Sequence, residues 1–165
     1  MASLDRLDAK LIGHLGEDPR ISVHDLATAL GVARNTVQSR LRRLKDNGTL
    51  KGFRPELDLP SIGISVQAFM GLELEQGRLQ AVLTVLRKLP EVLEIHATTG
   101  REDLLVRVAA TTQANLQATI ERIVSVEGVT HSTTTLALTS PLEYRIQPML
   151  HLLTRDSGHG RAQTR

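Results

Sequence analysis

Apolar residues recur every three or four positions over the first 47 residues, a spacing typical of amphipathic helices. Leu4, Leu7, Leu11 and Leu15 fall on one helical face, and Pro19 ends this first segment. Acidic residues lie near its start, where they suit the positive end of a helix dipole. The pattern predicts a first helix that begins near residue 4 and ends before residue 19.

Two more short helices follow, each with recognisable end signals. Ser22 and Asp25 have the spacing of a capping box, and Gly31 ends the apolar pattern that they introduce. The next segment has apolar residues at the same helical spacing and then a glycine suited to a left-handed cap: Val37, Leu41, Leu44 and Gly48. Residues 4–47 are therefore predicted to hold three helices, and residues 50–57 to be extended.

The pattern changes to strict alternation over residues 64–75, which predicts a strand with one buried face. Helical and alternating segments then follow in turn: a helix over 79–89, strands over 91–98 and 103–110, a helix over 115–126 and a strand over 129–139. The triplet Leu79-Gln80-Ala81 recurs as Leu116-Gln117-Ala118, which is consistent with two similar halves. The order βαββαβ predicts a ferredoxin-like sandwich with both helices on one face of the sheet.

These elements predict an α+β protein with two domains. We expect a helix-turn-helix domain, with or without a wing, over residues 1–52, an extended linker strand over 53–60, a ferredoxin-like domain over 61–146 and a C-terminal tail over 147–165. Pro55 and Pro60 mark the boundary between the domains, and the tail after Thr154 is expected to be disordered. The open face of the sheet should show Phe69, Val92, Leu105 and threonines, which favours dimerisation through the sheets.

Composition narrows the possible classes of protein. The chain has no cysteine, so disulfides and thiolate chemistry are excluded and a reducing, intracellular compartment is expected. No secretory signal pattern and no run of 18 apolar residues is found, so we expect a cytoplasmic protein with no membrane partner. The aromatic residues are only Phe53, Phe69 and Tyr144, which disfavours binding of single-stranded nucleic acid by stacking.

Charge is unevenly distributed along the chain. Formal net charge is +4 over residues 1–55, −4 over 56–146 and +2 over 147–165, and residues 34–51 hold six basic residues and one acid. This distribution suggests that the first domain meets a polyanion, although ordinary surface variation would also account for it.

The third helix presents a polar outer face. If its apolar residues face the core, Asn35, Ser39 and Arg42 point away from it, and Gln38 and Arg43 flank them. Side chains of these types bind base edges and phosphates of double-stranded DNA. The rim residues Arg34, Thr36 and Arg40 are expected to meet phosphates. Against this reading, any amphipathic helix needs a solvated face, and Ala33 stands where a helix N-cap serine or threonine is expected, which weakens the helix start by about 1 kcal/mol.

Several segments resemble one known family. They are Leu4-Asp5-x-x-Asp8, Arg20-Ile21-Ser22-x-x-Asp25-Leu26-Ala27, Val37-Gln38-x-Arg40-Leu41-x-Arg43-Leu44 and Asn47-Gly48-x-Leu50-Lys51-Gly52-Phe53. In these segments, and in Thr99-Gly100-x-x-Asp103, the chain is similar to the Lrp/AsnC (feast/famine) transcriptional regulators. The resemblance implies a helix-turn-helix joined by an extended strand to a ferredoxin-like effector-binding and oligomerisation domain. It further implies a homodimer that assembles to a tetramer or octamer and binds amino acids between dimers.

The loop between the two middle predicted strands is the candidate effector site. Gly100 frees a backbone amide for close approach, and Asp103 offers a carboxylate to an ammonium group. The resemblance identifies this as the family's effector loop, with further contacts from the last strand, and the candidate residues are Thr99, Gly100, Arg101, Glu102, Asp103, Ser132 and Thr134. Glu102 stands where the family commonly has tyrosine. A simple charged hairpin turn is the alternative reading of the loop.

The sequence gives no support to the hypothesis that this protein is an enzyme. The six histidines form no His-x-x-x-His pair, and no Gly-rich phosphate loop, nucleophile elbow or dinucleotide fingerprint occurs. We therefore expect no catalytic residue, metal or cofactor. The hypotheses are a DNA-binding transcriptional regulator responsive to an amino acid, an architectural DNA-binding protein without an effector and, least favoured, a subunit of an enzyme of amino-acid metabolism.

Overall fold

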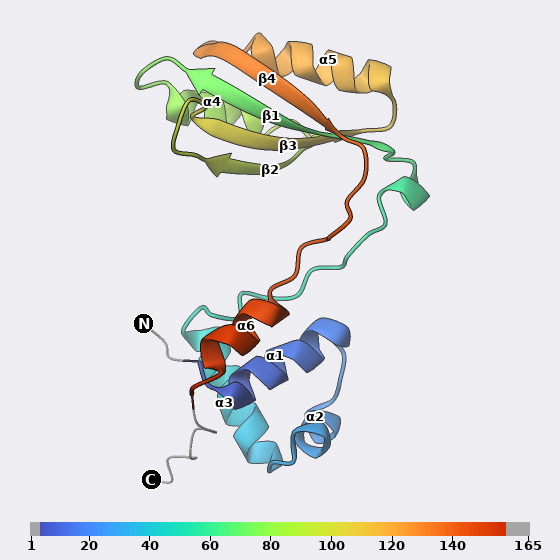
Figure 1. Cartoon of the computed structure of the whole chain (residues 1–165), viewed down its shortest axis with the longest axis vertical. Helices are drawn as coiled ribbons and strands as arrows, with labels where there is room; N and C mark the ends of the chain where they lie inside the picture. The colour runs from blue at the N-terminus through green and yellow to red at the C-terminus, as the bar shows by residue number, and fades with distance from the viewer. Residues whose placement is uncertain (1–3, 158–165) are drawn as a thin grey trace. The chain divides into compact units, whose positions relative to one another are not determined.

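The computed structural model describes residues 4–157 and shows two compact units (Figure 1). The first unit contains the described residues up to Pro55 together with those from Glu143 onward, and the second is Glu56–Leu142. The chain thus leaves the first unit, builds the second and returns. Most of the tail predicted to be disordered, residues 158–165, lies outside the described residues.

The first unit contains the three predicted helices, α1 (Arg6–Glu17), α2 (Val23–Leu30) and α3 (Arg34–Asp46). Their apolar faces meet in one cluster of buried side chains, Leu11, Leu15, Leu26, Ala27, Val37 and Leu44. Full burial of a leucine or valine side chain contributes about 1.5–3 kcal/mol, so this small core is the main source of stability for the three-helix arrangement.

The helix ends agree with the sequence in most respects. Ser22 caps α2 by accepting the Asp25 N–H, but the Asp25 carboxylate accepts from the Ser22 hydroxyl (2.6 Å) instead of closing a full capping box. The full box is at α1, between Asp5 and Asp8. Gly31 ends α2 in the left-handed region at φ 66°, which allows the sharp turn into α3.

A helix with no counterpart in the sequence prediction, α6 (Gln147–Thr154), packs on α1 (Figure 1). Its Leu150 and Thr154 are buried, and Gln147 Nε2 donates to the Ala9 carbonyl (2.9 Å). The Gln147 side chain lies over Gly13, where a Cβ would come within 2.6 Å of Nε2. Glycine at position 13 therefore lets α6 sit close to α1.

The second unit has the predicted βαββαβ order. It consists of β1 (Val66–Leu74), α4 (Leu79–Leu86), β2 (Val92–Ala97), β3 (Leu104–Ala110), α5 (Gln113–Val124) and β4 (Val129–Ala137). The strands form one sheet in the order β2-β3-β1-β4, and β1 is antiparallel to both β3 and β4. The fold class is therefore an N-terminal helix-turn-helix with a C-terminal ferredoxin-like sandwich.

The core of the second unit lies between the sheet and its two helices (Figure 1). Ala68, Met70 and Leu72 alternate along β1 and are all fully buried. Val82 of α4 and Ile123 of α5 pack against them in the same cluster. The opposite face is open and shows Phe69 and Leu105 at 40% and 38% exposure.

Three details of the sequence prediction are wrong. No strand lies between α3 and β1 in the described chain, so there is neither a wing nor a linker strand over 53–60. Pro55 and Pro60 lack the N–H that a ladder needs, and Pro60 instead begins the short 3-10 helix η1 (Pro60–Ile62). Val92 packs into the core opposite Val108, because an irregularity between Val92 and Glu94 shifts the register there.

Candidate nucleic-acid interface and effector loop

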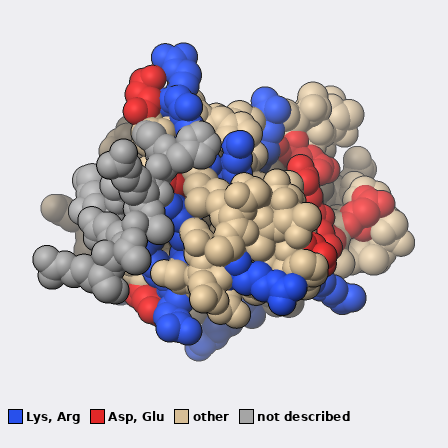
Figure 2. All heavy atoms as spheres, turned by 90° about the horizontal axis from the view of Figure 1, so that it is seen from below, with Lys and Arg blue, Asp and Glu red and all other residues tan. Residues whose placement is uncertain are grey.

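The outer face of α3 carries polar side chains that the core does not use. Val37 and Leu44 are buried, whereas the side chains that point away from them are exposed, namely Asn35, Gln38, Ser39 and Arg42. These four, with Arg43, Asp46 and Asn47, line an open hollow of about 610 Å³. Figure 2, seen from below relative to Figure 1, shows Lys and Arg at several separate places on this side, with Asp and Glu among them. The surface has the donors, acceptors and positive charge that DNA recognition requires.

The turn between α2 and α3 is fixed by backbone and side-chain contacts. The Val32 N–H donates to the Ala27 carbonyl at 3.0 Å. His24 Nδ1 accepts from Arg34 Nη2 at 2.8 Å, which ties the first turn of α2 to the first turn of α3. A guanidinium has only donors, so this contact requires Nδ1 to be unprotonated. As predicted from the sequence, Ala33 provides no side-chain cap for α3.

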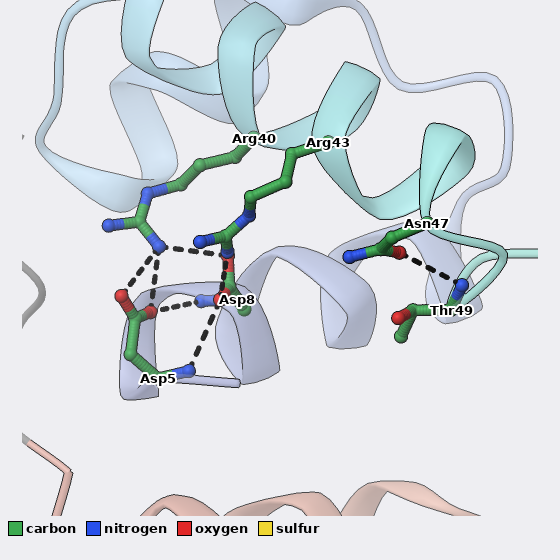
Figure 3. Close-up of polar contacts among 6 residues, drawn as sticks. All are labelled: Asp5, Asp8, Arg40, Arg43, Asn47 and Thr49. Carbon is green, nitrogen blue, oxygen red and sulfur yellow. Dashed lines mark hydrogen bonds and ion pairs between the residues drawn. The ribbon is translucent and has the colours of Figure 1, made fainter. Parts of the chain in front are cut away.

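Four charged side chains form a cluster, called here the α1–α3 ion cluster, that joins the start of α1 to the middle of α3 (Figure 3). Arg40 Nη1 lies 2.8 Å from Asp8 Oδ1 and 2.7 Å from Asp5 Oδ2. Arg43 Nη2 pairs with the other Asp8 oxygen, Oδ2. Asp8 is fully buried, and its Oδ2 also accepts the Asp5 N–H at 3.1 Å. The cluster therefore sets the rotation and height of α3 relative to α1.

The pKa values of the cluster follow from these contacts. Burial raises the pKa of Asp5, but hydrogen bonds from Arg40 and the Asp8 N–H, with the Arg40 charge, outweigh it and hold that pKa below its ordinary value. Burial also lowers the pKa of Arg40, and the two carboxylates more than compensate, so its pKa lies above its ordinary value. Both groups are therefore charged at neutral pH.

The cluster changes the interpretation of two arginines. Arg40, predicted to meet phosphates at the rim, is only 9% exposed and points at Asp5 and Asp8, so that prediction is wrong. Helical periodicity placed Arg40 near the rim but gave no sign of the carboxylates that draw it inward. Arg43 is half-exposed, and one of its nitrogens is held by Asp8.

Two residues beyond the predicted set also line the outer face of α3, Asp46 and Asn47. The Asn47 side chain closes the end of the helix, because its Oδ1 accepts the Thr49 N–H at 3.0 Å (Figure 3). Gly48 was the predicted helix-end signal, and Asp46 and Asn47 directly before it lie at the end of the outer face of α3.

The loop predicted to hold an effector joins β2 to β3 and is anchored to the end of β1. Asp103 donates its N–H to the Leu72 carbonyl (2.8 Å) and accepts the Leu74 N–H on Oδ2 (2.7 Å). The Thr98 hydroxyl donates to the Glu102 carbonyl at 2.5 Å and closes the loop. One oxygen of Asp103 therefore holds the loop to β1.

The rest of the loop is exposed or paired locally. Gly100 has φ 121°, a conformation that side-chain-bearing residues rarely adopt. Arg101 Nε pairs with Glu73 Oε1 at 2.7 Å. Glu102 lies over Gly71 of β1, where a Cβ would come within 2.6 Å of its Cγ. Residues 99–103 thus form one loop at the surface of the second unit.

The structure separates Ser132 and Thr134 from that loop. They lie on β4 directly opposite Leu72 and Met70, whose side chains face the core. Directly opposed residues share a face, so both side chains are on the helix-covered side, whereas Glu102 packs over the open side at Gly71. Within one chain the predicted contacts from the last strand do not join the loop.

No group of three His, Asp or Glu side chains that could hold a metal ion occurs in residues 4–157. Over the same residues, no helix is long and apolar enough to span a membrane.

Comparison with known proteins identifies both units. A model of the AsnC-type helix-turn-helix domain matches residues 4–45, and a model of the Lrp/AsnC ligand binding domain matches residues 67–146. The transcriptional regulator FL11 of Pyrococcus horikoshii is 30% identical over 135 residues, which cover 82% of this chain and 89% of that protein. AsnC of E. coli superposes with a TM-score of 0.81 at 26% identity, over 88% of this chain and 99% of AsnC.

A second solved structure supports the fold. The regulator NMB0573 of Neisseria meningitidis, solved as a complex with L-Met, superposes with a TM-score of 0.80 at 22% identity, over 88% of this chain and 99% of that one. The matched families and relatives are transcriptional regulators, not enzymes. With an AsnC-type helix-turn-helix beside a Lrp/AsnC ligand binding domain, the chain belongs to the Lrp/AsnC family of transcriptional regulators.

Proposed function

We propose that this regulator binds specific double-stranded DNA sequences through the outer face of α3 and that an amino acid at the β2–β3 loop changes that binding. The observation that carries the proposal is the exposed row of Asn35, Gln38, Ser39 and Arg42, held in place by the α1–α3 ion cluster. Asn35 and Gln38 suit adenine edges, and Arg42 suits guanine or a phosphate. Arg34, Thr36 and Arg43 lie beside them for phosphate contacts.

The DNA part of the proposal is tested by the salt dependence of binding. Arg42→Ala removes an exposed cation that forms no ion pair with the residues the structure describes, and we expect the log–log salt slope to fall in magnitude by about 1. Arg87→Ala is the matched control, because Arg87 is exposed on the second unit. Gel shifts on DNA upstream of the protein's own gene, at several salt concentrations, measure both. An unchanged slope and affinity for Arg42→Ala would remove α3 from the interface.

The effector part rests on the loop chemistry. Asp103 uses Oδ2 for the Leu74 N–H, which leaves Oδ1 to face an ammonium group, and the exposed amides near Gly100 suit a carboxylate. Glu102 beside Asp103 makes the surface acidic, because Arg101 is paired with Glu73. We therefore expect neutral or basic amino acids to bind better than aspartate or glutamate. The L-Met complex of a protein with this fold supports an amino acid as the ligand class.

Asp103→Asn tests the loop without breaking it. Asparagine keeps an acceptor for the Leu74 N–H but removes the charge, so amino-acid binding should weaken while ligand-free DNA binding stays within a few-fold of the parent. Calorimetry with the twenty amino acids, followed by gel shifts with and without the best one, gives both readouts. DNA binding that ignores every amino acid would favour an architectural DNA-binding protein instead.

The oligomeric part concerns the open sheet face. Phe69 and Leu105 leave apolar area uncovered there, so we expect a homodimer through the sheets that assembles further to a tetramer or octamer. Leu105→Glu should lower the mass measured by light scattering. Leu93→Glu is the control, because Leu93 on β2 is 46% exposed, against 38% for Leu105. Binding to chromosomal DNA would place the assembly at the nucleoid.

A further inference from the structure

Arg34, at the start of α3, is held by a histidine and not by a carboxylate. His24 Nδ1 lies 3.2 Å from Arg34 Nε and 2.8 Å from Arg34 Nη2. Within the described residues Arg34 forms no ion pair with an acid, whereas two later arginines of α3, Arg40 and Arg43, do. The side chains of His24 and Arg34 are both exposed, so a ligand can reach them.

The neutral partner leaves the charge of Arg34 available. A carboxylate would cancel the guanidinium charge and repel a DNA phosphate, whereas an imidazole that accepts at Nδ1 is uncharged. The two contacts occupy two of the five N–H groups of the guanidinium, so three remain to donate elsewhere. A guanidinium can donate to two oxygens of one phosphate at once. His24 therefore fixes the direction of the Arg34 side chain without reducing its charge.

The pair lies beside the surface that we propose meets DNA. Arg34 precedes Gln38 by about one helical turn, so the two side chains share a face of α3. Gln38 lines the hollow along that helix, and Arg34 and His24 line a second open hollow of about 490 Å³ at the turn between α2 and α3. No acidic residue lines the second hollow, whose other residues are Ala27, Thr28, Gly31, Val32 and Ala33. A sugar–phosphate backbone can therefore approach Arg34 without meeting a negative charge there.

We propose that His24 is a positioning residue for DNA binding, which holds the Arg34 guanidinium ready to bind one backbone phosphate beside the outer face of α3. An arginine that is not held must become ordered when DNA binds, and ordering such a side chain costs about 2- to 10-fold in affinity. The contact with His24 orders Arg34 before DNA arrives, so this loss is avoided. The inference rests on the proposed function, because it requires α3 to be the DNA-binding helix.

DNA affinity and its salt dependence, measured at pH 8 with the full-length protein, test the proposal. Imidazoles are neutral at that pH, so changes at position 24 alter no charge. We expect His24→Ala to weaken binding by about 2- to 10-fold, equally on DNA upstream of the protein's own gene and on unrelated DNA, with an unchanged salt slope. Arg34→Ala should also weaken binding and should lower the slope in magnitude by about 1. In the Arg34→Ala background, His24→Ala should have no further effect.

His24→Asn separates positioning from a direct contact of the histidine with DNA. The asparagine Oδ1 can take the place of Nδ1 and accept from Arg34, but asparagine has no group at the place of Nε2. We therefore expect His24→Asn to keep most of the parent's affinity. NMR relaxation of the Arg34 side chain should show it ordered in the DNA-free parent and in His24→Asn, and mobile in His24→Ala. The thermal midpoint of each variant should stay within a few degrees of the parent, because both side chains are exposed.

Unchanged DNA affinity in His24→Ala would overturn the proposal, as would an equal loss in His24→Ala and His24→Asn. An effect of His24→Ala that is the same with and without Arg34 would also overturn it. If Arg34→Ala weakens binding in any of these cases, the proposed function stands and only the role of His24 fails. Unchanged affinity in both Arg34→Ala and Arg42→Ala would refute the proposed function and this inference together.

Discussion

Replacing Asp8 by alanine tests the α1–α3 ion cluster most directly. The change removes the fully buried carboxylate that joins α1 to both arginines of α3. Arg43 is half-exposed and its guanidinium can be solvated by water, so the loss of its ion pair with Asp8 adds little to the destabilisation. Arg40 is 9% exposed and keeps its ion pair with Asp5. Breaking a buried pair costs about 3–5 kcal/mol, and because the Asp5 contact survives we expect Asp8→Ala to lower the stability by about 3 kcal/mol.

Amide hydrogen exchange at Leu11, in the middle of α1, reports the opening of the first unit alone. Its free energy of opening should fall by about 3 kcal/mol in Asp8→Ala and by less in Asp8→Asn, which keeps an acceptor for Arg40. Glu17→Ala is the control on the same helix, because the Glu17 side chain is 83% exposed and should contribute less than about 0.5 kcal/mol. If Asp8→Ala matched Glu17→Ala, the cluster would not stabilise the packing of α3, and our account of how the recognition helix is positioned would be refuted.

Three further changes are predicted from single contacts. The folded-state pKa of Asp5 lies below 3.8, so the stability that its carboxylate contributes is present above pH 3.8 and is lost as the pH falls through the folded pKa. In acid-unfolding measurements, Asp5→Asn should therefore lose less free energy of unfolding over that range than the parent. Gln147→Ala should remove the hydrogen bond to the Ala9 carbonyl and lower the free energy of unfolding by about 1 kcal/mol, measured by urea unfolding, and an unchanged midpoint would contradict the contact described for α6. Gly71→Ala should displace Glu102 and alter the NMR signals of the β2–β3 loop while those of α5 stay in place.

Periodicity predicted the elements whose partners are local. The three helices of the first unit and the βαββαβ order of the second each have an apolar stripe of the right period, and the structure contains all of them. The same reasoning failed at Val92. The register of β2 shifts between Val92 and Glu94, and this shift turns the Val92 side chain from the open face of the sheet to the core.

Contacts between distant charges were not predictable from the same patterns. Asp5 and Asp8 were read as favourable charges at a helix start, and Arg40 and Arg43 as a cationic face. Periodicity gives the direction of a side chain on its own helix but not the partner that another helix brings to it. The helix α6 was missed for a related reason, since its eight residues are stabilised by contacts with α1, far away in the sequence.

The return of the chain to α1 also constrains the order in which the parts of the protein can fold. The contact of Gln147 with Ala9 closes a loop that contains the whole second unit. Closing a loop costs more entropy as its flexible length grows. Once the second unit has folded, most of that length is no longer flexible, so the entropy cost of closing the loop is smaller. During synthesis from the N-terminus, α1, α2 and α3 emerge first, but the face of α1 that receives α6 stays uncovered until residues 147–154 have been translated. The DNA-binding unit is therefore completed only after the ligand-binding unit has been synthesised, so a chain that stops early carries an unfinished recognition unit.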